Sequence, residues 1–313
     1  MKNNYLLKHY KNLYYTTIKN KIHIYNKNID KSKWLSKTLY IRRSYRNHKW
    51  HAIDFAKRMA SLHDVDDLIK SIWEKLKQNN QLNNTIWIFT SDNGYNYGSH
   101  NLIHKMSPYE ESIHIPLYIY HPNNTNINIT IDKYVSLIDI APTILSFAGI
   151  AIPEYIDGID LFSSEFQNID RPLLFQYGGY MMTEMLSGIL MDVYLELHPT
   201  LLAFIPHVFF MDVPTFRAIR YNDYMFIEYH TVYGKPINNN KITNFYLYNT
   251  LSPPFFPYFS KLYREYEFYN IKQDHIEGVN LINTFNTTEF IYWKQLLDYY
   301  NECTGRGCLI TES

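Results

Sequence analysis

The feature that most constrains this chain is residues 85–119, where two short apolar runs flank a polar loop. The first run, Thr85 to Thr90, is short, β-branched and aromatic, and therefore predicts a buried strand. Ser91-Asp92-Asn93-Gly94 follows where that strand must end, and ligands of open α/β sheets bind at such an edge. Asn-Gly is also a common signal for a tight turn, so these four residues alone are equally compatible with a turn that has no functional role.

The residues after this turn favour a functional site. Lys105 follows Asp92 by 13 residues, and Tyr109-Glu110-Glu111-Ser112-Ile113 leads into the second apolar run, Ile115 to Tyr120. In this order the chain resembles the sulfatase family of the alkaline-phosphatase-like superfamily. That family shows Ser-Asp-Asn-Gly, a Gly-x-His segment, a lysine, Tyr-Glu-Glu-Ser-Ile and a Val/Ile-Pro strand. The resemblance covers residues 33–165 well and residues 217–313 more weakly.

The resemblance implies a fold class and a domain division. We expect an α/β protein with an incomplete alkaline-phosphatase-like sandwich and a small C-terminal subdomain made of an antiparallel sheet and a helix. Residues 1–165 correspond to the C-terminal portion of the sulfatase catalytic domain. Residues 166–313 correspond to a linker or insertion followed by the C-terminal α+β subdomain.

The resemblance also implies site residues and a cofactor. Asp92 and Asn93 match metal ligands, and their oxygens suit calcium, a hard cation. Lys105 matches a sulfate contact, where an ammonium offsets negative charge on the sulfate oxygens. His100 matches a position often occupied by histidine, which makes it a candidate for a catalytic contact to substrate, with a structural histidine as the open alternative. Two ligands are fewer than calcium takes, so we expect this chain alone to bind it weakly.

The family's nucleophile motif, Cys/Ser-x-Pro-x-Arg, does not occur in this sequence. Ser252-Pro253-Pro254 comes nearest, but Phe256 stands where the arginine is required. We therefore assign no nucleophile and interpret the chain as a truncated sulfatase-family protein. Its complete form is expected to hydrolyse sulfate monoesters with formylglycine and calcium. An inactive remnant and another hydrolase of the superfamily stay open.

The cysteines and asparagines bear on the compartment. Cys303 and Cys308 enclose two glycines, which favours a small disulfide loop over a metal or redox site and indicates an oxidising compartment. By resemblance we expect the secretory pathway, in a lysosomal or extracellular location, although Met1 to His9 shows no signal peptide. Glycosylation sequons begin at four asparagines: Asn83, Asn123, Asn128 and Asn286.

Charge and hydropathy limit the partners. The chain has 30 basic and 30 acidic residues, so nothing attracts it to nucleic acid as a whole. Its most apolar stretch, Gly188 to Val213, is interrupted by charged residues and prolines and predicts no transmembrane segment. The resemblance implies a sulfated small molecule or glycan as the partner, and the oligomeric state stays open.

Periodicity predicts the remaining elements. Residues 54–77 have helical spacing, and the acidic residues at 64, 66 and 67 lie on different faces of that helix, which indicates solvated side chains. Glu110 and Glu111 are interpreted as helix-start carboxylates. His104, beside Lys105, could in principle act as an acid or base. His114 alternates with two isoleucines and is interpreted as an outward-facing strand residue or a hydrogen-bonded core histidine. The second half predicts an antiparallel sheet and a final helix. The expected ranges are 216–220, 224–229, 245–248 and 267–270 for strands and 288–300 for the helix. The stretch 176–213 has no assignment.

Overall fold

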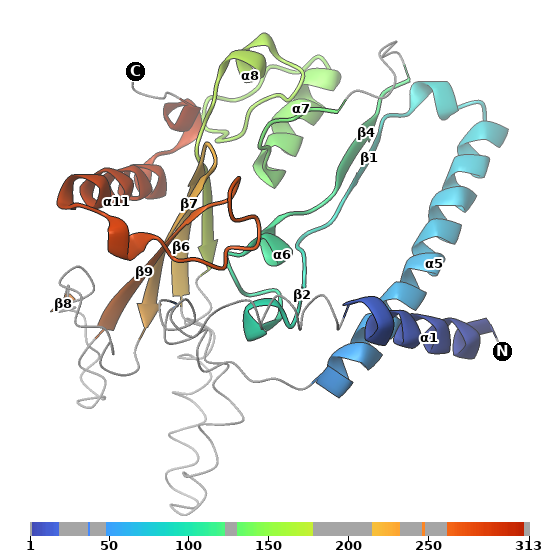
Figure 1. The fold of residues 1–313 in the computed structure, drawn as a ribbon. Coiled ribbons are helices and arrows are strands. Elements are labelled where there is room, and N and C mark those ends of the chain that lie inside the picture. Colours follow the sequence, from blue (N-terminus) through green and yellow to red (C-terminus); the bar gives the residue numbers. More distant parts are fainter. Residues whose placement is uncertain are drawn as a thin grey trace, which may run out of the picture. The chain divides into compact units, whose positions relative to one another are not determined.

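The computed structural model describes residues 2–18, 37, 48–122, 130–177, 215–231, 246–247 and 262–309 (Figure 1). These residues belong to two compact units. The first unit comprises Met1–Ser32 and Arg43–Lys133, and the second comprises Lys33–Arg42 and Tyr134–Ser313. The predicted domain boundary after residue 165 remains a prediction. Nearly all of the unassigned stretch 176–213 lies outside the described residues, as do the sequons at Asn123 and Asn128.

Helices form one part of the first unit. α1 (Lys2–Leu13) runs into a π-helical turn and lies against α5 (His48–Gln78), the long helix expected from the spacing of apolar residues. Tyr14, Ala52 and Phe55 are buried together between them, and the rings of Tyr14 and Phe55 are 5.6 Å apart. The acidic residues at 64, 66 and 67 are exposed, as expected for a solvated helix face.

The two apolar runs form the predicted strands. β1 (Trp87–Thr90) and β4 (Leu117–Tyr120) pair antiparallel, with Trp87 opposite Tyr120. Directly opposed residues share one face of a sheet. Trp87 and Tyr120 therefore both contact Trp73 of α5, at ring-centroid distances of 5.6 and 5.8 Å. This aromatic contact holds the start of β1 beside the helix.

Three short elements connect β1 to β4. β2 (Asn96–Tyr97) and β3 (Ile103–His104) pair antiparallel and are followed by α6 (Glu110–Ile113). The acidic residues Glu110 and Glu111 occupy the first turn of α6, which confirms their interpretation as helix-start carboxylates. Carboxylates at this end interact favourably with the helix dipole.

The second unit contains the expected antiparallel sheet. Its strands are β5 (Leu173–Tyr177), β6 (Thr215–Tyr221), β7 (Tyr224–Thr231), β8 (Tyr246–Leu247) and β9 (Leu262–Asn270). They lie in the order β5-β6-β7-β9-β8, and every neighbouring pair is antiparallel. β5 is a strand that the sequence did not predict.

The final helix covers one face of this sheet (Figure 1). α11 (Thr287–Glu302) starts at a capping box, in which the Asn286 side chain accepts from the Glu289 amide at 2.9 Å. Its buried side chains pack on alternate residues of the strands, as a half-buried sheet requires. The shared core comprises Ile219, Phe226, Tyr266, Phe268, Ile282, Trp293, Leu297 and Tyr300.

A helical segment precedes the sheet. It contains α7 (Ile140–Phe147) and α8 (Ser164–Asn168). The fully buried Asp139 carboxylate accepts from the backbone amides of Ser136 and Ile159 and pairs with Arg171. This one side chain therefore ties the start of α7 to the segment that follows the helix. Among the described residues, no helix is both long enough and apolar enough to cross a membrane.

Candidate functional site

The loop after β1 is built around a glycine. Gly94 donates its amide to the Ser112 carbonyl at 2.8 Å, which joins the loop to α6. A Cβ at position 94 would lie 2.1 Å from the Glu111 carbonyl oxygen, so only glycine fits here without a shift of backbone. The Ser91 hydroxyl donates to the Asn93 carbonyl at 2.9 Å. The Asn-Gly pair lies in a loop that bends at Asp92, and contact with α6 sets the shape of this loop.

The structure brings Asp92, Asn93 and Lys105 together. Lys105 Nζ donates to Asn93 Oδ1 at 2.8 Å and lies 3.6 Å from Asp92 Oδ2. The Asp92 side chain is 80% exposed and the Lys105 side chain 50% exposed. Two side-chain oxygens and one ammonium therefore meet at the surface of the first unit.

Asn96 positions the segment that carries Lys105. It lies opposite His104 in the β2–β3 pair, and its side chain is fully buried. Its amide nitrogen lies 3.1 Å from the His104 carbonyl, 3.0 Å from Ser107 Oγ and 2.7 Å from Ser112 Oγ. Both ends of the Lys105 segment are thus held by one side chain. Sequence reasoning missed Asn96, because asparagine is abundant in this chain and no spacing distinguishes it.

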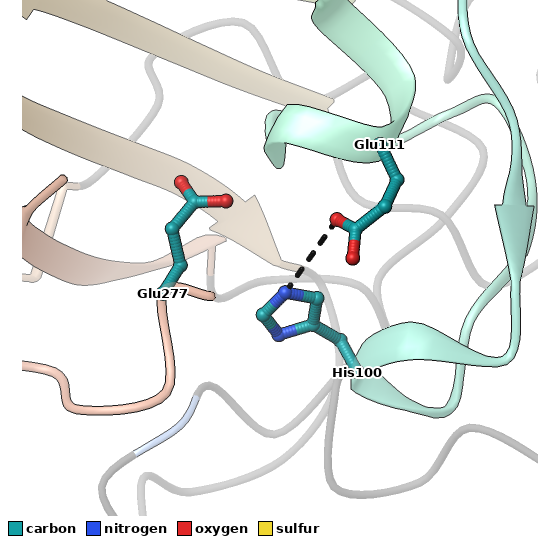
Figure 2. A group of neighbouring side chains, drawn as sticks. All are labelled: His100, Glu111 and Glu277. Atoms are coloured by element: carbon teal, nitrogen blue, oxygen red, sulfur yellow. Dashed lines mark ion pairs between the residues drawn. The ribbon is translucent and has the colours of Figure 1, made fainter. Parts of the chain in front are cut away.

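His100 is fully buried and has φ 53°, a left-handed conformation. Its ring stacks on Tyr109 with centroids 3.7 Å apart, and its Nε2 lies 3.8 Å from Glu111 Oε2. Figure 2 shows the imidazole directed at the Glu111 carboxylate. These contacts belong to the packing of the first unit, and a substrate contact by His100 remains a prediction.

His104 and His114, the other two histidines near Lys105, also have partners within the protein. His104, with φ 69°, places Nδ1 3.2 Å from the Tyr95 hydroxyl, and the Arg58 guanidinium lies 3.9 Å from the Tyr95 ring centroid. Burial raises the pKa of the Tyr95 phenol, and Asp54 adds to the rise. His114 is exposed at the end of α6 and pairs with Glu110 at 3.0 Å. His114 is therefore not the strand residue that its alternation with isoleucines suggested.

The donor set fits calcium in kind. Asp92 offers a carboxylate, and the Asn93 amide is oriented by a 2.8 Å hydrogen bond from Nδ2 to the Gly94 carbonyl, which leaves Oδ1 for a cation. Lys105 Nζ donates a hydrogen bond to this oxygen. Calcium takes about six to eight oxygens, so Asp92 and Asn93 could supply only part of a coordination shell.

Comparisons with known proteins relate this chain to one family. A model of the sulfatase family matches residues 6–150. An arylsulfatase of Clostridium perfringens is 38% identical over 104 residues, which cover 32% of this chain and 22% of that protein. The N-acetylglucosamine-6-sulfatase of Bos taurus is 41% identical over 99 residues, which cover 31% of this chain and 18% of that protein. The resemblance to the sulfatase family is confirmed.

Solved structures share the fold. One, a protein in complex with its substrate D-glucosamine-2-N,6-O-disulfate, superposes with a TM-score of 0.51 at 22% identity and covers 80% of this chain and 41% of its own. A phosphonate monoester hydrolase from Silicibacter pomeroyi gives 0.51 at 17% identity and covers 84% and 44%. The fold is alkaline-phosphatase-like, as predicted. The chain spans less than half of either solved structure and about a fifth of the two curated relatives.

Proposed function

We propose that this chain is part of a sulfatase-type hydrolase of sulfate monoesters. The observation that carries the proposal is the convergence of Asp92, Asn93 and Lys105, with Lys105 Nζ 2.8 Å from Asn93 Oδ1. The motif order around these residues and the match of residues 6–150 to the sulfatase family support the same conclusion.

Each of the three side chains has a distinct role in this proposal. Asp92 and Asn93 would hold calcium through their side-chain oxygens, and calcium would supply positive charge to the bound sulfate group. Lys105 donates to a sulfate oxygen and stabilises the negative charge that develops as the S–O bond breaks. The nucleophile of a complete form would be a formylglycine hydrate, and this sequence contains no Cys/Ser-x-Pro-x-Arg motif from which it is made.

The substrate class follows from the relatives. Curated relatives include arylsulfatases and N-acetylglucosamine-6-sulfatases, and one structural neighbour binds a sulfated glucosamine. We therefore propose an aryl sulfate or a sulfated sugar. Relatives with extracellular sulfatase in their names and the disulfide between Cys303 and Cys308 support a location in the secretory pathway, in lysosomes or outside the cell.

Hydrolysis by a complete form, in which the family's nucleophile motif accompanies this chain, tests the proposal. Release of 4-nitrophenol from 4-nitrophenyl sulfate by that form, lost in its Lys105→Ala variant, is the expected result. The second candidate is a phosphonate ester hydrolase, because one solved structure with a similar fold is such an enzyme. Faster hydrolysis of a phenyl phosphonate ester than of the sulfate ester would favour this candidate. Failure to turn over either ester would assign the chain, as it stands, to the inactive alternative.

A further inference from the structure

The Lys105 ammonium contacts the same two side-chain oxygens to which a metal ion would bind. It donates to Asn93 Oδ1 at 2.8 Å and lies 3.6 Å from Asp92 Oδ2. Asn93 cannot turn Oδ1 away without losing the 2.8 Å hydrogen bond from its Nδ2 to the Gly94 carbonyl. One oxygen thus serves either the lysine or a metal ion that approaches along the same direction.

A cation at this oxygen repels Lys105. If both the metal ion and the Lys105 ammonium contacted Asn93 Oδ1, their positive charges would repel each other even in water. The repulsion is stronger where the surroundings are less polar. Lys105 is half exposed and has a flexible four-carbon stem, so its head can leave without moving the backbone. The backbone on both sides stays fixed, because Asn96 binds the His104 carbonyl and Ser107.

We infer that Lys105 is an internal competitor for the metal site, and that binding of a divalent cation at Asp92 and Asn93 releases the lysine. The inference rests on the proposed function for the metal ligands. The inference adds that the metal ion binds before Lys105 becomes available to the substrate. Before the cation binds, the ammonium is engaged with Asn93 and Asp92. After the cation binds, the ammonium is available to an oxyanion such as sulfate.

The competition predicts that removal of the lysine charge strengthens cation binding. Lys105→Met keeps the length of the side chain and removes the hydrogen bond and the ion pair. An exposed ion pair is worth up to about 1 kcal/mol, so Ca²⁺ should bind Lys105→Met about fivefold more tightly than the unmodified protein. If the ammonium does not engage Asn93 and Asp92 before calcium binds, Lys105→Met and the unmodified protein should have nearly equal affinity.

Isothermal titration of the whole chain with calcium chloride, without sulfate or any ester, makes the test. Lys105→Arg keeps the charge and should bind like the unmodified protein. Lys272→Met is a matched control, because Lys272 is exposed and pairs with Asp223 at 3.4 Å in the second unit. It removes the same charge from the molecule and should leave calcium affinity unchanged. Asp92→Ala identifies the site by abolishing the binding.

The outcomes separate the two claims. Tighter binding by Lys105→Met alone supports the inference. Equal or weaker binding by Lys105→Met, with binding still lost in Asp92→Ala, overturns the competition and leaves the proposed metal ligands in place. Binding that survives Asp92→Ala, or a lack of calcium binding by both the unmodified protein and Lys105→Met, overturns the metal site and the inference with it. Equal tightening in Lys272→Met assigns the effect to net charge and also rejects the competition.

Discussion

At the scale of single residues, the close approach of Gly94 to α6 determines where Asp92 and Asn93 lie. The contact between the position of a Cβ and the Glu111 carbonyl is 2.1 Å, far inside van der Waals distance. The turn motif predicts a glycine for its backbone conformation. In the structure the φ of Gly94 is not positive, and the reason is steric, because a side chain would push this loop away from α6.

Gly94→Ala should therefore destabilise the first unit. We expect the free energy of unfolding to fall by about 1–3 kcal/mol, as for other overpacked sites, because backbone on one side must move. Urea denaturation measures the change. Gly307→Ala is the control, since a Cβ there meets nothing within 4 Å. Equal stability of the Gly94→Ala and Gly307→Ala variants would contradict the packing argument.

Asn96→Ala is the second prediction at this scale. The substitution leaves the buried hydroxyls of Ser107 and Ser112 without the amide that donates to them. Ser107 Oγ still donates to Ser112 Oγ, so the cost comes from the hydrogen bonds of the Asn96 amide, and we expect the free energy of unfolding to fall by about 1–3 kcal/mol. Asn84→Ala, at an exposed position in the same unit, should change the unfolding free energy by less than about 0.5 kcal/mol. Chemical denaturation of the two variants side by side makes the comparison, and equal losses would reject the role of Asn96.

At the scale of elements, a buried carboxylate joins the five-stranded sheet to α11. Glu228 on β7 is fully buried, and its two oxygens lie 2.6–3.5 Å from four basic side chains. These side chains are Arg217, His230, Arg264 and Lys294. Lys294 lies on α11, and Asp298, one turn further along, pairs with both Arg217 and Lys294. The sheet and the helix therefore share one ionic network.

Glu228→Gln should destabilise the second unit strongly. Removal of one member of a buried ionic network leaves the other charges uncompensated, at a cost of about 3–5 kcal/mol. Glu302→Gln, at the exposed end of α11, makes the same chemical change and should cost less than about 0.5 kcal/mol. Unfolding free energies from urea titrations give both values. A loss in Glu228→Gln no larger than that in Glu302→Gln would show that the network contributes little.

The same carboxylate predicts a dependence of stability on pH. Burial alone would raise the pKa of Glu228, but hydrogen bonds from His230 and Arg217 outweigh it and hold the pKa far below the ordinary value of 4.5. A depressed folded-state pKa contributes stability that is complete above the unfolded value and is lost as pH falls below it. The unmodified protein should thus lose more stability between about pH 5 and pH 3 than Glu228→Gln does, and parallel curves in that window would refute the assignment.

At the scale of the whole molecule, the chain divides into two compact units, and a disulfide closes a loop in the second. The first contains the candidate site, and the second ends in a loop closed by the disulfide between Cys303 and Cys308. This loop contacts the segment before α8 and α8 itself. Its Arg306 donates its amide to the Glu154 carbonyl at 3.1 Å and its guanidinium to Glu165 at 2.7 Å. The disulfide therefore also fixes the loop whose Arg306 contacts Glu154 and Glu165.

Removal of the disulfide should lower the stability of the second unit. For so short a loop the chain-entropy model gives about 2 kcal/mol, and the docking contacts depend on the same loop. Calorimetry of Cys303→Ser/Cys308→Ser should show one transition at a lower temperature. Reduction of the unmodified protein with dithiothreitol should reproduce the shift. A melting temperature that neither treatment changes would show that the loop stays docked without its covalent bond.

The sequence by itself determined the local elements and the order of the motif. Alternation and helical spacing are properties of neighbouring residues, so they predicted β1, β4, α5, α11 and most of the antiparallel sheet. β5 was missed because its five residues, Leu173–Tyr177, pair with a strand that begins only at Thr215. Pairing at that separation leaves no local signature.

The tertiary structure decided which side chains meet. Proximity of Asp92, Asn93 and Lys105 was expected from the family, but the hydrogen bond from Lys105 to Asn93 Oδ1 was not. Neither the three polar contacts of Asn96 nor the convergence of basic groups on Glu228 could be read from spacing. Each depends on residues that lie apart in the chain, and burial, which makes such polar contacts strong, exists only after the chain has folded.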